Sequence, residues 1–260
     1  MVDLEYKWNL NFYQETVNRC EVIIAKESEK WKTANDINYY FLSTYAKAIL
    51  TTREALCLLT NGYPDGALSR AREVYEQAVI ALYISNNYSD ELMERYFADY
   101  ELKVYKNRKL LYGMLKKIVS TQKEKYQELE DECQKIIDDL KQQYGNINGD
   151  YWWVLDNKIK SFNDMQANVG AELLLILYKR ACISTHAGAL SDIALLGRDN
   201  KQGSLLRTDQ TWEGFEAPIL LLIGSFDVLT RIIFSHFKIN LPDGYNLKEI
   251  YEDLWKVVFH

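Results

Sequence analysis

The chain is poor in proline, the residue that most often interrupts a helix. Only three prolines occur among 260 residues, at Pro64, Pro218 and Pro242. A proline inside a helix removes a backbone donor and clashes with the preceding turn. Long stretches without such breakers, with apolar residues three and four positions apart, favour long helices over many short strands. We therefore predict an all-α fold.

The sequence also lacks the patterns from which most metal and nucleotide sites are built. It has three histidines and four cysteines, without a C-x-x-C pair, so we expect no zinc site. The glutamate three positions before histidine that a di-iron bundle needs is missing, as are a G-x-x-x-x-G-K-[ST] phosphate loop and a G-x-S-x-G elbow. We expect no cofactor. The cysteines fall among helical apolar positions, which predicts buried, reduced thiols at Cys20, Cys57, Cys133 and Cys182.

Positive charge is in deficit, because 31 Lys and Arg stand against 37 Asp and Glu, a formal net charge of -6. Coating a nucleic acid needs a cationic surface, so this balance argues against a general nucleic-acid coat but permits a local basic pocket. The most apolar run, 217–226, is too short to span a bilayer, and the acidic first residues lack a signal-peptide core. We expect a cytoplasmic protein with no membrane partner.

Helical and turn signals along the chain predict a single domain over 1–260, a bundle of about six to eight helices. Gly- and Asn-containing turns separate the apolar segments. The predicted helices span 4–31, 35–61, 68–82, 90–111, 121–144, 169–196, 218–237 and 247–259. Helix 169–196 is apolar on most sides, so we expect it at the centre. Residues 197–216 are polar and break the pattern.

The pattern of residues 90–144 predicts a charged helical hairpin. In one interpretation this hairpin projects from the bundle. Ser89 is the expected N-cap of its first helix, and Thr121 with Glu124 forms a capping box before its second. The second helix carries a narrow apolar seam at Tyr126, Leu129, Cys133, Ile136 and Leu140. The seam suits dimerisation or pairing within the hairpin, and its spacing does not separate the two.

Two helical features carry groups with chemistry, and the first is Arg72 with Glu76. Their i, i+4 spacing places both on one stripe with Val79 and Tyr83, beside the apolar face of the predicted helix 68–82. A charge pair at the margin of a core orients neighbouring helices, or it faces a ligand. Both interpretations remain open at this point.

The second feature is Arg180 with His186, near the end of the most apolar helix. An imidazole takes and gives protons near neutral pH, and an arginine stays charged and holds phosphate. Small residues follow at 187–189, where a ligand can approach closely. Arg198, with Lys201 and Arg207, adds positive charge in the next loop. The alternative is a core histidine bonded to a carbonyl.

The Arg-x5-His spacing resembles the Arg-x(4–6)-His signature of the HEPN family, helical proteins that include metal-independent ribonucleases of bacterial toxin and phage-defence systems. A second match lies at Arg231 and His236. HEPN ribonucleases usually have a polar residue directly after the arginine, whereas Ala181 and Ile232 follow here. The resemblance implies a HEPN-like fold, a homodimer that shares the site, and Arg180 and His186 as catalytic residues.

A broader set of short motifs is similar to an uncharacterised helical family of bacterial proteins, known only as a domain of unknown function. The motifs are Arg72-x3-Glu76 with Tyr83-Ile84, Arg95-Tyr96 with Tyr100, and Tyr178 eight residues before His186. They span residues 40–195, and Cys182 stands where the family often has serine. This resemblance implies that Arg72, Glu76 and His186 belong to one site. We take Arg72, Glu76, Tyr178 and Arg198 as the candidate substrate-binding residues.

The leading functional expectation is a metal-independent, HEPN-like endoribonuclease that acts in growth arrest or phage defence. Its expected partners are RNA, a second copy of the chain, and an antitoxin or defence protein. The rival is a non-catalytic helical interaction or ligand-sensing module, which the acidic charge suits better. A pocket beside Arg72 and Glu76, or the hairpin 90–144, would serve such a module.

Overall fold

The computed structural model describes residues 2–29, 36–145, 152–153, 159–170, 174–185, 196–199, 203–206 and 214–249. The chain forms two compact units, one of residues 1–85 with 169–260 and one of residues 86–168. The predicted hairpin 90–144 lies entirely within the second unit. A single domain over the whole chain stays a prediction.

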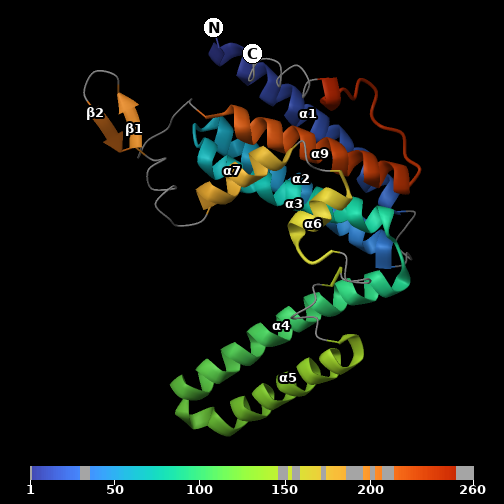
Figure 1. Cartoon of the computed structure of the whole chain (residues 1–260), viewed down its shortest axis with the longest axis vertical. Coiled ribbons are helices and arrows are strands. Elements are labelled where there is room, and N and C mark those ends of the chain that lie inside the picture. Colours follow the sequence, from blue (N-terminus) through green and yellow to red (C-terminus); the bar gives the residue numbers. More distant parts are fainter. Residues whose placement is uncertain are drawn as a thin grey trace. The chain divides into compact units, whose positions relative to one another are not determined.

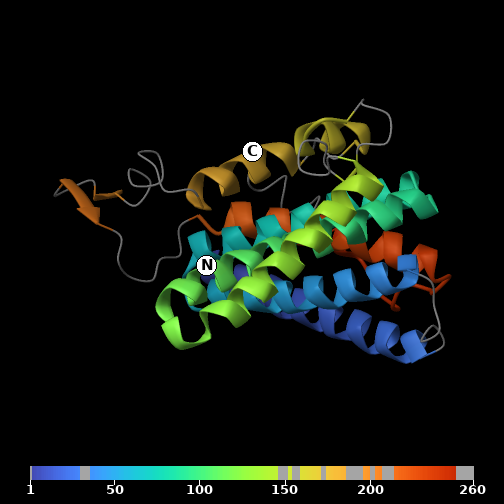
Figure 2. The same cartoon turned by 90° about the horizontal axis from the view of Figure 1, so that it is seen from below.

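The first unit is a bundle of long helices, and the all-α prediction is confirmed. Its helices are α1 (Val2–Ser28), α2 (Asp36–Thr60), α3 (Pro64–Asn86), α7 (Leu175–Thr185) and α9 (Glu216–His236). Helices α1, α2 and α9 pack against one another, and α7 packs on α9 (Figures 1 and 2). Helix α3 begins at Pro64, ahead of the predicted apolar stripe that starts at Leu68, because a proline fits the first turn, where its missing N–H costs nothing.

Helix α9 occupies the core of this unit. Nearly every residue from Ala217 to Thr230 is buried. The rings of Tyr13 and Tyr45 pack on Phe226, with centroid distances of 6.0 Å and 5.6 Å. Helix α9 is long and apolar enough to cross a membrane by composition, but 83% of that window is buried inside the protein. Burial on all sides explains its apolar composition.

The prediction that helix 169–196 is central was wrong. The described helix there is α7, which begins at Leu175, and Leu196 already belongs to a strand. Ile176 is 72% exposed and Ile183 47% exposed, so one side of α7 faces solvent. An apolar composition indicates that a helix is buried, but how completely it is buried depends on which other helices surround it. The predicted helix 247–259 falls outside the described residues after 249.

A two-stranded antiparallel hairpin lies where only a polar break was predicted. Strand β1 (Leu196–Asp199) pairs with β2 (Gly203–Leu206), and Asp199 is opposite Gly203. Neither strand shows the alternation of apolar and polar residues that identifies a half-buried strand. The sequence therefore carried no usable signal for this hairpin.

The second unit contains α4 (Asp90–Ile118), a 3₁₀ turn at Ser120–Gln122, α5 (Lys123–Tyr144) and α6 (Phe162–Asn168). The Ser89 cap is confirmed, because Ser89 Oγ accepts the Leu92 N–H at 3.1 Å. The capping box at Thr121 was wrong. Helix α5 begins at Lys123 without a side-chain cap, since the 3₁₀ turn takes the place of the expected N-terminus.

Helices α4 and α5 lie side by side (Figure 1), and the hairpin that they form has its own apolar core. Ala98 and Leu102 of α4 pack with Ile137 and Leu140 of α5, flanked by three half-buried side chains, Tyr105, Ile136 and Tyr144. Ile136 and Leu140 of the predicted seam therefore pack within the hairpin, and Tyr126 of the seam stacks on Tyr112 of α4. Arg95, near the start of α4, donates to the carbonyl of Tyr144 at the end of α5 at 3.1 Å and to the Trp152 carbonyl at 3.2 Å. These two hydrogen bonds hold together the end of the hairpin opposite its turn.

The four cysteines lie in described helices and are free thiols, but only part of their predicted burial is correct. Cys20 and Cys133 are buried, Cys182 is half-buried and Cys57 is exposed. Burial raises the pKa of the Cys20 thiol from its ordinary 9.0 to about 11. Cys57 follows Leu56, which is buried, and a single helical step of about 100° is enough to turn a side chain to solvent.

Candidate functional site

The predicted pair of Arg72 and Glu76 forms a direct ion pair on α3. Arg72 Nε donates to Glu76 Oε1 at 2.8 Å, with 22% and 33% of the two side chains exposed. The i, i+4 spacing alone brings the two side chains together on a helix. Partial burial strengthens the pair relative to one in open solvent, where screening reduces such contacts to little.

Tyr178 of α7 completes this group. Its hydroxyl donates to the same Glu76 Oε1 at 3.2 Å, across 102 residues of sequence. Its ring lies 4.9 Å from the Tyr75 ring and 5.7 Å from the Arg72 guanidinium carbon. We call Arg72, Tyr75, Glu76 and Tyr178 the α3–α7 cluster. Three of the predicted substrate-binding residues therefore contact one another.

Electrostatics in the α3–α7 cluster favour a charged arginine and a neutral phenol. Burial lowers the pKa of Arg72, but the hydrogen bond and the charge of Glu76 outweigh it, and the pKa is raised above its ordinary value. Burial, followed by the negative charge of Glu76, raises the pKa of Tyr178 well above 10.0. Cys182 lies one turn along α7 and also contributes to the raised pKa of Tyr178. The cluster therefore offers a fixed cation beside a hydroxyl that stays protonated.

Arg180, the predicted phosphate-binding residue, is not part of this cluster. It is exposed, and it follows Tyr178 by two positions. Two positions on an α-helix are about 200° apart, so Arg180 and Tyr178 occupy nearly opposite faces of α7. The neighbouring Lys179 is also exposed. The exposed charge of Arg180 is therefore separate from the α3–α7 cluster.

The side chains of the remaining predicted site residues lie outside the described part of the structure. His186 lies outside the described residues, directly after the last residue of α7. Arg198 is in strand β1, opposite Ser204, where only the backbone is described. Lys201 and Arg207 also lie outside the described residues. The single site of Arg72, Glu76 and His186 stays a prediction.

The second Arg–His match, Arg231 and His236, splits between different partners. Arg231 Nε donates to both carboxylate oxygens of Asp227 at 3.0 Å and 2.9 Å. His236 Nε2 hydrogen-bonds Asn38 Oδ1 at 2.6 Å, and its ring lies 4.7 Å from Phe41. Burial lowers the pKa of His236 below 6.5. Each side chain thus binds a separate structural partner.

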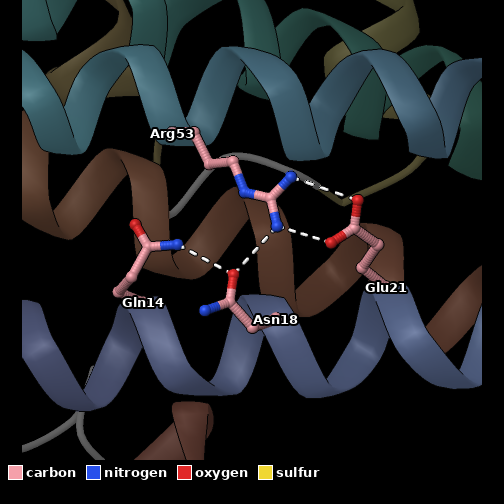
Figure 3. Close-up of polar contacts among 4 residues, drawn as sticks. All are labelled: Gln14, Asn18, Glu21 and Arg53. Atoms are coloured by element: carbon pink, nitrogen blue, oxygen red, sulfur yellow. Dashed lines mark hydrogen bonds and ion pairs between the residues drawn. The ribbon is translucent and has the colours of Figure 1, made fainter.

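A polar group that the sequence did not indicate joins α1 to α2 (Figure 3). Arg53 of α2 donates to both carboxylate oxygens of Glu21 on α1, at 3.1 Å and 2.5 Å, and to Asn18 Oδ1 at 2.9 Å. Gln14 donates to the same Asn18 oxygen at 3.0 Å. No local spacing reveals these contacts, because the arginine and its partners belong to different helices.

Beside this group lies an open groove of about 530 Å³ between α1 and α2. Its walls are mostly apolar, formed by residues such as Ile24, Leu42, Ile49 and Leu50. Arg53 and Glu21 line it as well, but they bind each other through two hydrogen bonds. A ligand that used either charge would have to break this pair.

Comparison with known proteins adds one family relationship. No curated protein and no solved structure is similar to the chain. One family model matches residues 38–203, and it carries the description "Family of unknown function (DUF5677)". The matched segment includes the α3–α7 cluster and Arg180, and it ends before α9. Because it covers more than half of the sequence, the chain belongs to this family of unknown function, DUF5677.

Proposed function

We propose that the chain is a metal-independent, HEPN-like endoribonuclease, with Arg180 and His186 as its catalytic residues. His186 removes the proton of a ribose 2′-hydroxyl, and the 2′-oxygen attacks the neighbouring phosphorus. The bond from phosphorus to the 5′-oxygen breaks, and that oxygen leaves with a proton. Arg180 stabilises the extra negative charge of the pentacovalent transition state. The products are a 2′,3′-cyclic phosphate and a 5′-hydroxyl.

The exposure of Arg180 carries this proposal. A catalytic guanidinium must reach the phosphate of a large substrate, and Arg180 lies exposed on the last two turns of α7 with the cation Lys179 beside it. The α3–α7 cluster ties α7 to α3 through Tyr178 and Glu76. An anchored helix holds Arg180 in one place, and preorganised charge stabilises a transition state best.

Within this proposal the substrate is RNA, and the biological setting is growth arrest or phage defence. A second copy of the chain, and an antitoxin or defence protein, are its proposed protein partners. The net charge of -6 limits general attraction to RNA. Recognition would therefore depend on the local positive charge of Lys179 and Arg180 rather than on the whole surface.

Cleavage of RNA by the purified chain, in buffer with chelator, tests the proposal. We expect cyclic-phosphate ends from the wild type and at least a hundredfold slower cleavage (order of magnitude) after Arg180→Ala or His186→Ala. Lys179→Ala is the matched comparison, because it removes an equally exposed charge one residue away: it should weaken RNA binding but leave the cleavage rate at saturating RNA nearly unchanged. Equal losses in Lys179→Ala and Arg180→Ala would indicate general RNA attraction. Intact RNA across salts and pH, with the protein folded, would refute the proposal.

A second candidate is a ligand-sensing module, and the separation of the α3–α7 cluster from Arg180 favours it. In the α3–α7 cluster the Arg72 guanidinium and the Tyr178 hydroxyl both donate to Glu76 Oε1, so a small anion would bind there by replacing the Glu76 carboxylate as their acceptor. Thermal unfolding with inorganic phosphate or adenosine monophosphate tests it. A rise in melting temperature that Arg72→Gln abolishes, in a protein that does not cleave RNA, would support the sensor.

A further inference from the structure

Helix α4 has a second apolar face, on the side opposite α5. Its inner face packs Ala98, Leu102 and Tyr105 into the hairpin core. On the other side several large apolar side chains are exposed: Tyr100 by 64%, Leu110 by 66%, Leu111 by 52%, Met114 by 53% and Ile118 by 74%. Scattered exposed apolar residues are ordinary, but a continuous row on one helix marks an interaction surface.

The spacing of this row is that of a coiled coil. The row runs through Tyr100, Val104, Asn107, Leu111, Met114 and Ile118, with steps of four and three residues in alternation. Such a sequence of steps keeps side chains on one narrow stripe over three heptads, where they interlock with a partner helix. Asn107 is the one polar member, and a polar residue in such a seam selects one register. The occupant that fits is therefore another long helix.

Charge along α4 identifies a second copy of α4 as that helix. Acidic residues gather towards its N-terminal end and basic residues towards its C-terminal end: Asp90, Glu91, Glu94, Asp99 and Glu101, then Lys103, Lys106, Arg108, Lys109, Lys116 and Lys117. Arg95 is the exception, and it donates to two carbonyls of its own unit. Two copies side by side in antiparallel orientation place each acidic half against a basic half. A parallel pair would place like charges together along its whole length.

We propose that the outer face of α4 is a self-association surface, through which two copies of this chain pair antiparallel, with Glu101 of one copy facing Arg108 of the other. Both side chains flank the row and are exposed. In this register Tyr100 faces Leu111 of the second copy, and Val104 faces Asn107. In an antiparallel pair an a position of one helix lies opposite a d position of the other. The segment 100–111 therefore serves both copies, and Met114 and Ile118 extend beyond it.

The experiment measures the mass of the full chain in solution, by light scattering or sedimentation, over a range of concentrations. We expect a dimer for the wild type and a monomer for Leu111→Glu, with the helical circular dichroism unchanged because Leu111 is exposed. Val22→Glu on α1 is the matched control, since Val22 is also apolar and 67% exposed. The control is expected to remain a dimer.

A charge swap tests the orientation. The symmetric dimer contains the Glu101–Arg108 contact twice. Either single variant, Glu101→Arg or Arg108→Glu, places like charges at both contacts and is expected to weaken the dimer by about tenfold. The double variant restores opposite charges and is expected to recover wild-type affinity. A monomeric wild type, a dimer that Leu111→Glu leaves intact, or a double variant as weak as the single ones would overturn the proposal.

Discussion

The hydroxyl of Tyr178 on α7 donates to Glu76 on α3 at 3.2 Å, and this contact links parts of the chain that are 102 residues apart. Glu76 also binds Arg72 through the same carboxylate oxygen. One oxygen therefore accepts from a guanidinium and a phenol, and both donors are partly buried. The contact attaches a half-exposed helix, α7, to the helix bundle.

Removing this hydroxyl should loosen α7. We expect Tyr178→Phe to lower the free energy of unfolding by about 0.5–1.5 kcal/mol, because one hydrogen bond to a charged acceptor is lost and little shape changes. Urea denaturation measures the change. Tyr39→Phe is the control, since Tyr39 is 67% exposed and should change stability little. Equal effects of the two substitutions would show that the Tyr178 hydroxyl contributes nothing.

Stability should fall at alkaline pH, in part through Cys20. Burial raises the pKa of this thiol from 9.0 to about 11. A raised pKa means that the thiol loses its proton more easily in the unfolded chain than in the folded one. The stability that the protonated Cys20 contributes is therefore complete below pH 9 and is lost as the pH rises towards 11. Burial likewise raises the pKa values of Tyr13 and Tyr45 above 10.0, and both act in the same direction.

Urea denaturation at pH 7 and at pH 10 checks this expectation. Cys20→Ala should reduce the loss of stability between the two pH values, although it lowers stability at both by leaving a small cavity. Cys57→Ala should leave the loss unchanged, because Cys57 is exposed. An identical pH dependence in the wild type and Cys20→Ala would contradict the assignment.

Arg231 should stabilise the fold by balancing a buried carboxylate. Asp227 is only 8% exposed and receives both of its described hydrogen bonds from Arg231. Arg231→Met leaves this carboxylate without that donor and should cost about 1–3 kcal/mol in the free energy of unfolding. The double variant Arg231→Met with Asp227→Asn should recover part of the loss, because no buried charge remains. A double variant that loses the sum of both single effects would contradict this explanation.

Of the two apolar faces of α4, only the inner one should contribute to the stability of the hairpin. Leu102 is 1% exposed and packs in the hairpin, so Leu102→Ala should cost about 2–4 kcal/mol. Leu110→Ala on the same helix should cost little, since Leu110 is 66% exposed. Both are measured by urea denaturation at a concentration low enough for a monomer. A large loss in Leu110→Ala under those conditions would mean that the outer face is covered within one chain.

The helices themselves were largely predictable from the sequence. Apolar spacing identified α1, α2, α4, α5 and α9 to within a few residues at most of their ends, and Ser89 was correctly named as a cap. The i, i+4 pair of Arg72 and Glu76 was also predictable. These features depend on residues within one or two helical turns, where the geometry of the helix decides which side chains meet.

Contacts between helices were not predictable in the same way. Spacing indicated that α7 and α9 are both apolar, but it could not rank them, and α9 holds the core while α7 exposes Ile176. Nor could it show that Arg53 binds Glu21 across α1 and α2. Such contacts depend on how the helices are packed, and many packings are compatible with one amphipathic pattern.

The sequence by itself therefore determined the helical class, most helix boundaries and the local Arg72–Glu76 pair. Only the tertiary structure decided that Tyr178 joins this pair and that Arg180 faces away from it. The physical reason is that local order follows from backbone geometry over a few residues, whereas a site built from α3 and α7 exists only after distant segments have packed together.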